Sequence, residues 1–137
     1  MTTPFVERRR YPRAEIDFRG VLEAADGEEA QLRARNISAS GIYFDADRRL
    51  AEFTEVSLVV RLPSVGNLPA AQFQCAGVIV RVEERAEDTP WPFGVAVHFT
   101  AIADLHRAAI VAYVEAVLAR AGAANEPPAA GSPAPRN

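Results

Sequence analysis

The stretch that decides the fold reads Phe93-Gly94-Val95-Ala96-Val97-His98-Phe99. Val95, Val97 and Phe99 alternate with small or polar residues, and a period of two is typical of a strand that is buried on one face. Similar short segments, separated by turn residues, precede it near residues 15–23, 30–37, 41–45, 56–62 and 70–84. Several strands at this spacing predict an antiparallel barrel or sandwich.

The period changes immediately after this last strand. Large apolar residues then recur every three or four positions from Ile102 to Leu118, which predicts a single helix. Thr100 is a suitable N-cap, Asp104 suits the positive end of the helix, and Gly122 suits its C-terminal end. We expect this helix to pack its apolar face against the strands, because that face cannot remain in water.

The composition is typical of one globular domain. The chain has 137 residues, of which 49% are hydrophobic and 24% charged, and Cys75 is its single cysteine. One cysteine excludes an internal disulfide framework, and no apolar run approaches the length of a membrane span. The polar, basic N-terminus does not resemble a signal peptide, so we expect a cytoplasmic protein. We divide the chain into a flexible arm at 1–13, a barrel with its helix at 14–122, and a disordered tail at 123–137.

Two short segments stand out from this ordinary background. The first is an arginine cluster, Arg8-Arg9-Arg10-Tyr11-Pro12-Arg13. The second, about twenty-five residues later, is a polar turn, Asn36-Ile37-Ser38-Ala39-Ser40-Gly41. All fifteen basic residues are arginine, yet the net charge is -3, so the clustering is more informative than the total charge.

The residue types in these segments suit a guanine nucleotide. A guanidinium matches phosphate oxygens, and it also matches the adjacent O6 and N7 acceptors of guanine. The Asn36 amide can accept a hydrogen bond from a guanine N–H, and the Ser38 hydroxyl can donate or accept. Gly41 would permit a positive φ and a close approach of ligand to backbone. The alternative is a turn whose side chains only satisfy its own backbone.

Together the two segments resemble the signature of the PilZ domain, a bacterial receptor module for cyclic di-GMP. Arg9 and Arg13 fill its Arg-x-x-x-Arg motif, and Asn36, Ser38 and Gly41 fill its Asp/Asn-x-Ser-x-x-Gly motif. The resemblance covers roughly residues 7–120. It implies a mainly β fold: a six- to seven-stranded antiparallel barrel with one C-terminal helix packed on it.

The resemblance also implies a mode of action. Arg8 occupies a position that, in the family, often accompanies binding of a stacked ligand dimer, whereas Arg10 would face solvent or the second ligand copy. Asn36 stands where many members carry Asp, so it lacks that charge and would weaken guanine recognition. The arm would become ordered on binding and signal to an effector protein in trans, with motility or biofilm behaviour as the output.

Nothing in the sequence specifies an enzyme, a metal site or a cofactor. His98 and His106 are not spaced as a metal pair, Cys75 reads as a small core residue, and Asp45 and Asp47 read as a solvated turn. Two alternatives remain open. One is a PilZ-fold interaction module that does not bind nucleotide. The other is a small barrel for single-stranded nucleic acid, which the acidic balance and the concentration of arginines in an arm make unfavourable.

Overall fold

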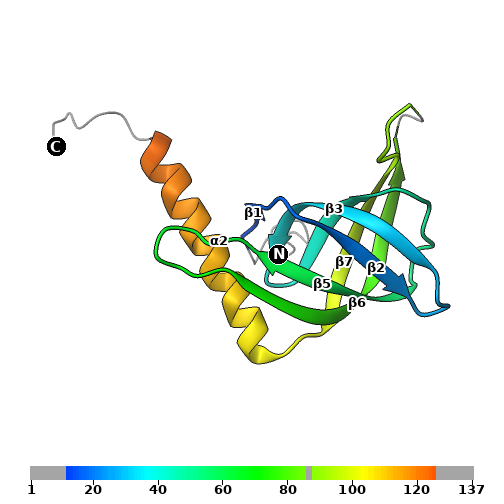
Figure 1. Ribbon diagram of the computed structural model, residues 1–137, viewed down its shortest axis with the longest axis horizontal. Helices are drawn as coiled ribbons and strands as arrows, with labels where there is room; N and C mark the ends of the chain where they lie inside the picture. Colours follow the sequence, from blue (N-terminus) through cyan, green and yellow to red (C-terminus); the bar gives the residue numbers. More distant parts are fainter. Residues whose placement is uncertain (1–11, 86–87, 126–137) are drawn as a thin grey trace, which may run out of the picture.

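The protein is an antiparallel β-barrel with one long helix beside it (Figure 1). The computed structural model describes residues 12–85 and 88–125. Its elements are β1 (Ala14–Glu15), β2 (Arg19–Ala24), β3 (Glu29–Ser38), β4 (Gly41–Ala46), β5 (Glu55–Leu62), β6 (Ala71–Glu84), β7 (Phe93–Ala101) and α2 (Asp104–Asn125). Arg8, Arg9 and Arg10 lie outside the described residues.

The barrel closes because β3 has partners on both edges. The sheet runs in the order β1-β3-β2-β5-β6-β7-β4, and β4 pairs again with β3. Six strands therefore form a closed ring, and β1 is one extra strand attached to β3. Every pairing is antiparallel. Closure removes the exposed sheet edges. The predicted fold class, a small antiparallel barrel with a C-terminal helix, is confirmed.

The strand predicted near 15–23 is interrupted. β1 and β2 both pair with β3, but residues 16–18 between them belong to neither strand. The ladder is still held across the gap, because the Ile16 amide donates to the Arg35 carbonyl at 3.1 Å and the Ala34 amide donates to the Phe18 carbonyl at 2.8 Å. The first strand of the barrel therefore bends at this point, beside the site described below.

Alternation along each strand fills the barrel with apolar side chains. The residues with no more than 2% exposure are mainly Leu, Ile, Val, Phe and Ala. Burying them supplies the main driving force for closure. Cys75 is 5% exposed, which confirms it as a core residue. Strand β6 is irregular at Gly77, because the β6–β7 register shifts between Ala76 and Gly77.

Helix α2 differs from its prediction at both ends. Thr100 lies within β7, so it is not the N-cap, and the helix begins at Asp104 and continues to Asn125. Its buried contacts come from Ile110, Tyr113 and Val114. No described helix is long and apolar enough to cross a membrane.

The apolar face of α2 is also narrower than its spacing suggested. Leu105 is 77% exposed and Leu118 is 42% exposed, although both belong to the predicted apolar series. The helix packs mainly on β1 and β3, and its His106 ring stacks on Phe73 of β6 at 4.4 Å, all at one end of the barrel (Figure 1). That contact is too narrow to cover every apolar residue of the series.

Candidate functional site

The two sequence motifs meet where β1 pairs with β3. Glu15 lies opposite Asn36 in the ladder, and Arg13 precedes β1 directly. The Arg13 Nη1 atom donates to the Asn36 Oδ1 atom at 3.2 Å, and both side chains remain open to solvent. The pairing of a strand of only two residues thus brings together two side chains that lie 23 positions apart in the sequence.

The second motif forms the tight turn between β3 and β4. Ser38 pairs with Gly41 across the hairpin, and the Ser40 amide donates to the Ser38 hydroxyl at 3.2 Å. The Ser38 and Ser40 hydroxyl oxygens lie 3.1 Å apart and share a further hydrogen bond. Ser38 is 2% exposed, so its hydroxyl holds the turn that follows Asn36. A contact between this hydroxyl and a ligand stays a prediction.

One of the two reasons given for Gly41, a positive φ, was wrong, whereas the close approach of a ligand stays a prediction. Among the described residues, the glycines with positive φ are Gly27 and Gly66, so Gly41 does not need that freedom. A Cβ atom on Gly41 would instead overlap the carbonyl oxygen of Val97 and lie 3.3 Å from its carbonyl carbon. The missing side chain permits β4 to approach β7 closely, and no ligand is required to explain it.

Helix α2 holds both halves of this site. The Tyr113 hydroxyl donates to the Glu15 carbonyl oxygen at 3.0 Å, which fixes the strand that follows the arm. The Arg107 Nη1 atom donates to the Ala39 carbonyl oxygen at 2.6 Å, which fixes the turn of the second motif. Burial raises the pKa of Tyr113, so this phenol remains a neutral donor.

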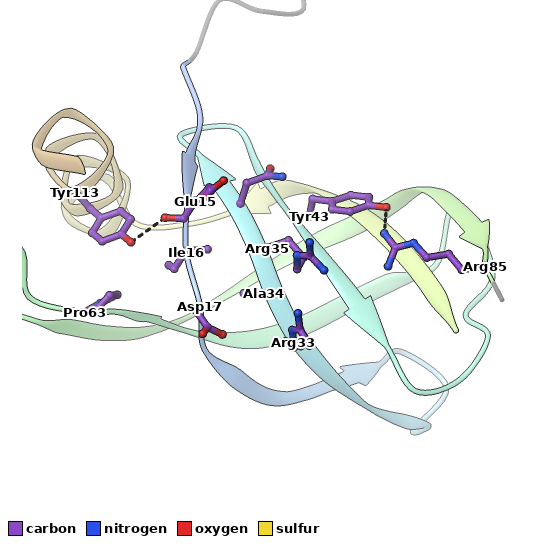
Figure 2. Close-up of a pocket in the computed structure, with 11 residues that line it drawn as sticks. Glu15, Ile16, Asp17, Arg33, Ala34, Arg35, Tyr43, Pro63, Arg85 and Tyr113 are labelled. Carbon is purple, nitrogen blue, oxygen red and sulfur yellow. Dashed lines mark hydrogen bonds between the residues drawn. The ribbon is translucent and has the colours of Figure 1, made fainter. Parts of the chain in front are cut away.

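An open groove of about 600 Å³ lies beside the Arg13–Asn36 contact. This volume falls within the range of small-molecule sites in proteins. The groove is lined by Glu15, Ile16, Asp17, Arg33, Ala34, Arg35, Asn36, Tyr43, Pro63, Arg85 and Tyr113. Figure 2 shows Tyr113 pointing toward Glu15 at one end and Tyr43 pointing toward Arg85 at the other.

A buried carboxylate lies under the end of the groove that Tyr43 and Arg85 form. The Arg35 Nη1 atom lies 2.8 Å from one oxygen of Asp45, and the Arg85 Nη1 atom donates to the other oxygen. The Asp45 side chain is only 3% exposed, because these two guanidiniums cover it. The prediction of a solvated turn is therefore wrong for Asp45. Asp47 is exposed, and its carboxylate accepts the Gln31 amide at 3.0 Å.

Tyr43 extends this charged cluster. Its hydroxyl donates to Glu83 at 2.9 Å and accepts from Arg85 Nη2 at 2.5 Å. Burial, followed by the hydrogen bond to Glu83, raises the pKa of Tyr43. The hydrogen bond to Asp45 likewise raises the pKa of Arg85. Gly94 of β7 lies beneath, and any Cβ there would collide with the Tyr43 hydroxyl and the Arg85 guanidinium.

Sequence reasoning missed this cluster. Arg35 directly precedes Asn36, and Tyr43 and Asp45 occupy outward-facing positions of β4, so those three could have been marked as neighbours. Arg85 lies forty positions after Asp45, in a charged connection with no local signal. Only the closure of the barrel brings it to the groove.

Comparisons with known proteins agree with this architecture. The sequence profile of the PilZ domain matches residues 7–116. The inhibitor of motility MotI/DgrA from Bacillus subtilis is a similar solved structure, with 21% identity and a TM-score of 0.65, covering 87% of this chain and 54% of that one. The MrkH–c-di-GMP complex from K. pneumonia has 17% identity and a TM-score of 0.66, covering 86% and 56% respectively.

A third similar structure is the PilZ domain of YcgR from Escherichia coli with c-di-GMP. It has 15% identity and a TM-score of 0.56, and the match covers 87% of this chain and 99% of that one. At these identities the likeness shows the fold alone. The chain spans about half the length of the MotI and MrkH chains it matches. A comparison with curated protein sequences finds no match.

Proposed function

The chain belongs to the PilZ domain family, and from this premise we propose that it binds cyclic di-GMP in the groove beside Asn36. The observation that carries the proposal is the 3.2 Å contact between Arg13 and Asn36. This contact joins a cation of the first motif, Arg13, to an amide of the second, Asn36, which lines the groove. Similar solved structures were determined with c-di-GMP, which supports the choice of ligand.

The groove offers complementary chemistry for a guanine nucleotide. Among the described residues, Arg13 gives one of its five N–H donors to Asn36, and the other four are enough for a phosphate or for the O6/N7 edge of guanine. We propose that Arg9 and Arg8, and with a smaller part Arg10, complete the contacts from the preceding residues. Asn36 would accept a guanine N–H, while Ser38 and Gly41 keep the turn in place.

We further propose that ligand binding orders the arm against the barrel and that an effector protein in trans recognises the changed surface. A ligand shifts such an equilibrium only by its differential affinity for the two states, and contacts from the arm would supply that difference. We propose a cytoplasmic binding protein without catalysis. Its output in motility or biofilm behaviour is suggested by the similar inhibitor of motility.

Titration calorimetry tests this function directly. We expect binding of cyclic di-GMP, and much weaker binding of cyclic di-AMP and GMP. Arg9→Ala and Arg13→Ala should each weaken it by about 1–3 kcal/mol, the value of one bidentate guanine contact. Arg48→Ala is the matched control, because Arg48 is exposed and lies outside the groove. No binding by the unaltered protein, or unchanged affinity in both arm variants, would contradict the proposal.

One observation favours the alternative of an interaction module without nucleotide. The Ser38 hydroxyl is buried and its hydrogen bonds lie within its own turn, so the second motif is satisfied without a ligand. The same titration separates the two functions, because a module of that kind would give no heat with cyclic di-GMP.

A further inference from the structure

The groove has a second end, to which the two motifs contribute no described side chain. Arg35 and Arg85 approach each other there over the buried Asp45 carboxylate. Arg85 is additionally held by the Tyr43 hydroxyl at 2.5 Å (Figure 2). Their side chains remain 48% and 34% exposed, so each guanidinium is fixed on one side and open to the groove on the other.

These guanidiniums retain most of their hydrogen-bonding capacity. Each has five N–H donors. Arg35 gives one to Asp45, and Arg85 gives one to Asp45 and one to Tyr43. The two cations share the Asp45 carboxylate, and Glu83, which accepts from the Tyr43 hydroxyl, is a second carboxylate near this end. Because Asp45 is buried and cannot turn away, the planes of both guanidiniums are set before any ligand arrives.

The groove is lined by both guanidiniums and carboxylates, and this combination suits guanine. The groove is also lined by the carboxylates of Glu15 and Asp17, from β1 and the segment that follows it, and by the guanidinium of Arg33. Guanine presents two acceptors, O6 and N7, on one edge and N–H donors on another, so guanidiniums and carboxylates can bind it from opposite sides. Adenine places an amino group where guanine has O6, and that donor would face the guanidiniums without a partner.

We propose that Arg35 and Arg85, positioned by Asp45 and Tyr43, form a second base subsite that selects guanine over adenine. This subsite would receive the half of the cyclic dinucleotide that Arg13 and Asn36 do not hold. The inference rests on the proposed function, because it concerns the same ligand in the same groove. It adds residues outside both sequence motifs and gives them the role of determining specificity.

The experiment compares two ligands that differ in one base. Cyclic di-GMP carries two guanines, whereas 3′,3′-cyclic GMP-AMP carries one guanine and one adenine on the same backbone. The unaltered protein should bind cyclic di-GMP about 5- to 150-fold more tightly, the range expected for one bidentate base contact. Calorimetry with both ligands gives this ratio for each variant.

Arg85→Lys is the decisive variant. A lysine keeps the charge and an ion pair with Asp45, so the barrel remains intact, but it lacks the planar fork that reads O6 and N7. The affinity ratio should fall by about tenfold, mainly through weaker binding of cyclic di-GMP. Arg85→Ala should lower the ratio similarly, with its thermal midpoint checked because it removes one partner of a buried carboxylate. Arg49→Ala, at an exposed arginine outside this groove, should leave the ratio unchanged.

Three results would overturn the subsite. If Arg85→Lys keeps the ratio of the unaltered protein, guanine is not read by Arg85, and the proposed function stands without this inference. If both ligands weaken equally in Arg85→Ala, the residue contacts a phosphate or only supplies charge. If the unaltered protein binds neither ligand, the proposed function fails and this inference fails with it.

Discussion

Replacing Gly41 by alanine tests the close approach of two barrel strands. The added Cβ would overlap the Val97 carbonyl oxygen and lie 3.4 Å from the His98 Cα atom. Both are backbone atoms of β7, so no side chain can rotate away and β4 must move. Overpacking of this kind costs about 1–3 kcal/mol. The shift also threatens the 2.9 Å hydrogen bond from the Phe99 amide to the Ser40 carbonyl, worth about 1 kcal/mol.

We therefore expect Gly41→Ala to lower the free energy of unfolding by about 2–4 kcal/mol, a large part of the 5–15 kcal/mol typical of a domain. In urea the midpoint should fall by roughly 1–2 M, given a slope of about 2 kcal/mol per M. Gly20→Ala is the matched control, because the nearest atom to a Cβ there is Phe18 Cε1 at an ordinary 3.9 Å. If the two variants unfold within about 0.5 kcal/mol of each other, the close approach does not constrain this position.

The remaining predictions concern the helix contact, the buried thiol and the buried carboxylate. Tyr113→Phe removes the hydrogen bond to the Glu15 carbonyl, so the free energy of unfolding should fall by about 1 kcal/mol. The Ile16 amide should also exchange faster in hydrogen-exchange experiments, and unchanged exchange would contradict this prediction. Burial raises the pKa of Cys75 from 9.0 to about 11, so the folded state holds that proton longer than the unfolded state. The contribution of Cys75 to stability should be constant below pH 9 and fall by about 2–3 kcal/mol as the pH rises to about 11. Urea unfolding at several pH values measures this change, and Cys75→Ala should make the slope shallower, leaving the part that comes from other groups such as Tyr43 and Tyr113. Asp45→Asn leaves two guanidiniums without their carboxylate, and a loss of about 1–3 kcal/mol in the same unfolding assay is expected; stability equal to the unaltered protein would show that the cluster contributes nothing.

The fold was largely predictable because its signals are local. Alternation in segments such as 56–62 and 93–99 requires only neighbouring residues, and the change of period after Phe99 marks the helix without any tertiary information. The failures have tertiary causes. Leu105 has the spacing of a core residue, yet the barrel does not reach it. The bend at residues 16–18 follows from pairing with β3, which alternation alone does not reveal.

The candidate site was likewise predictable where its signals are local and unpredictable where they are tertiary. The motif residues Arg13 and Asn36 could be marked from the sequence, because their types suit a guanine nucleotide and their spacing resembles a known signature. Asp45 was misjudged because it was assigned with Asp47 to a solvated turn, whereas it lies within β4 and is buried. Its burial depends on Arg85, which arrives from forty positions away. A long-range ion pair of this kind leaves no local pattern to detect.

Tyr113 and Arg107 lie six positions apart on one helix, and they hold two different segments of the site, β1 at Glu15 and the β3–β4 turn at Ala39. A shift of α2 on the barrel would therefore change the distance between those two segments. Thermodynamic linkage makes such a coupling reciprocal. Under the proposed function, a molecule that binds the outer side of the helix and shifts it on the barrel would change the affinity for the nucleotide, and the nucleotide would change the affinity for that molecule by the same factor.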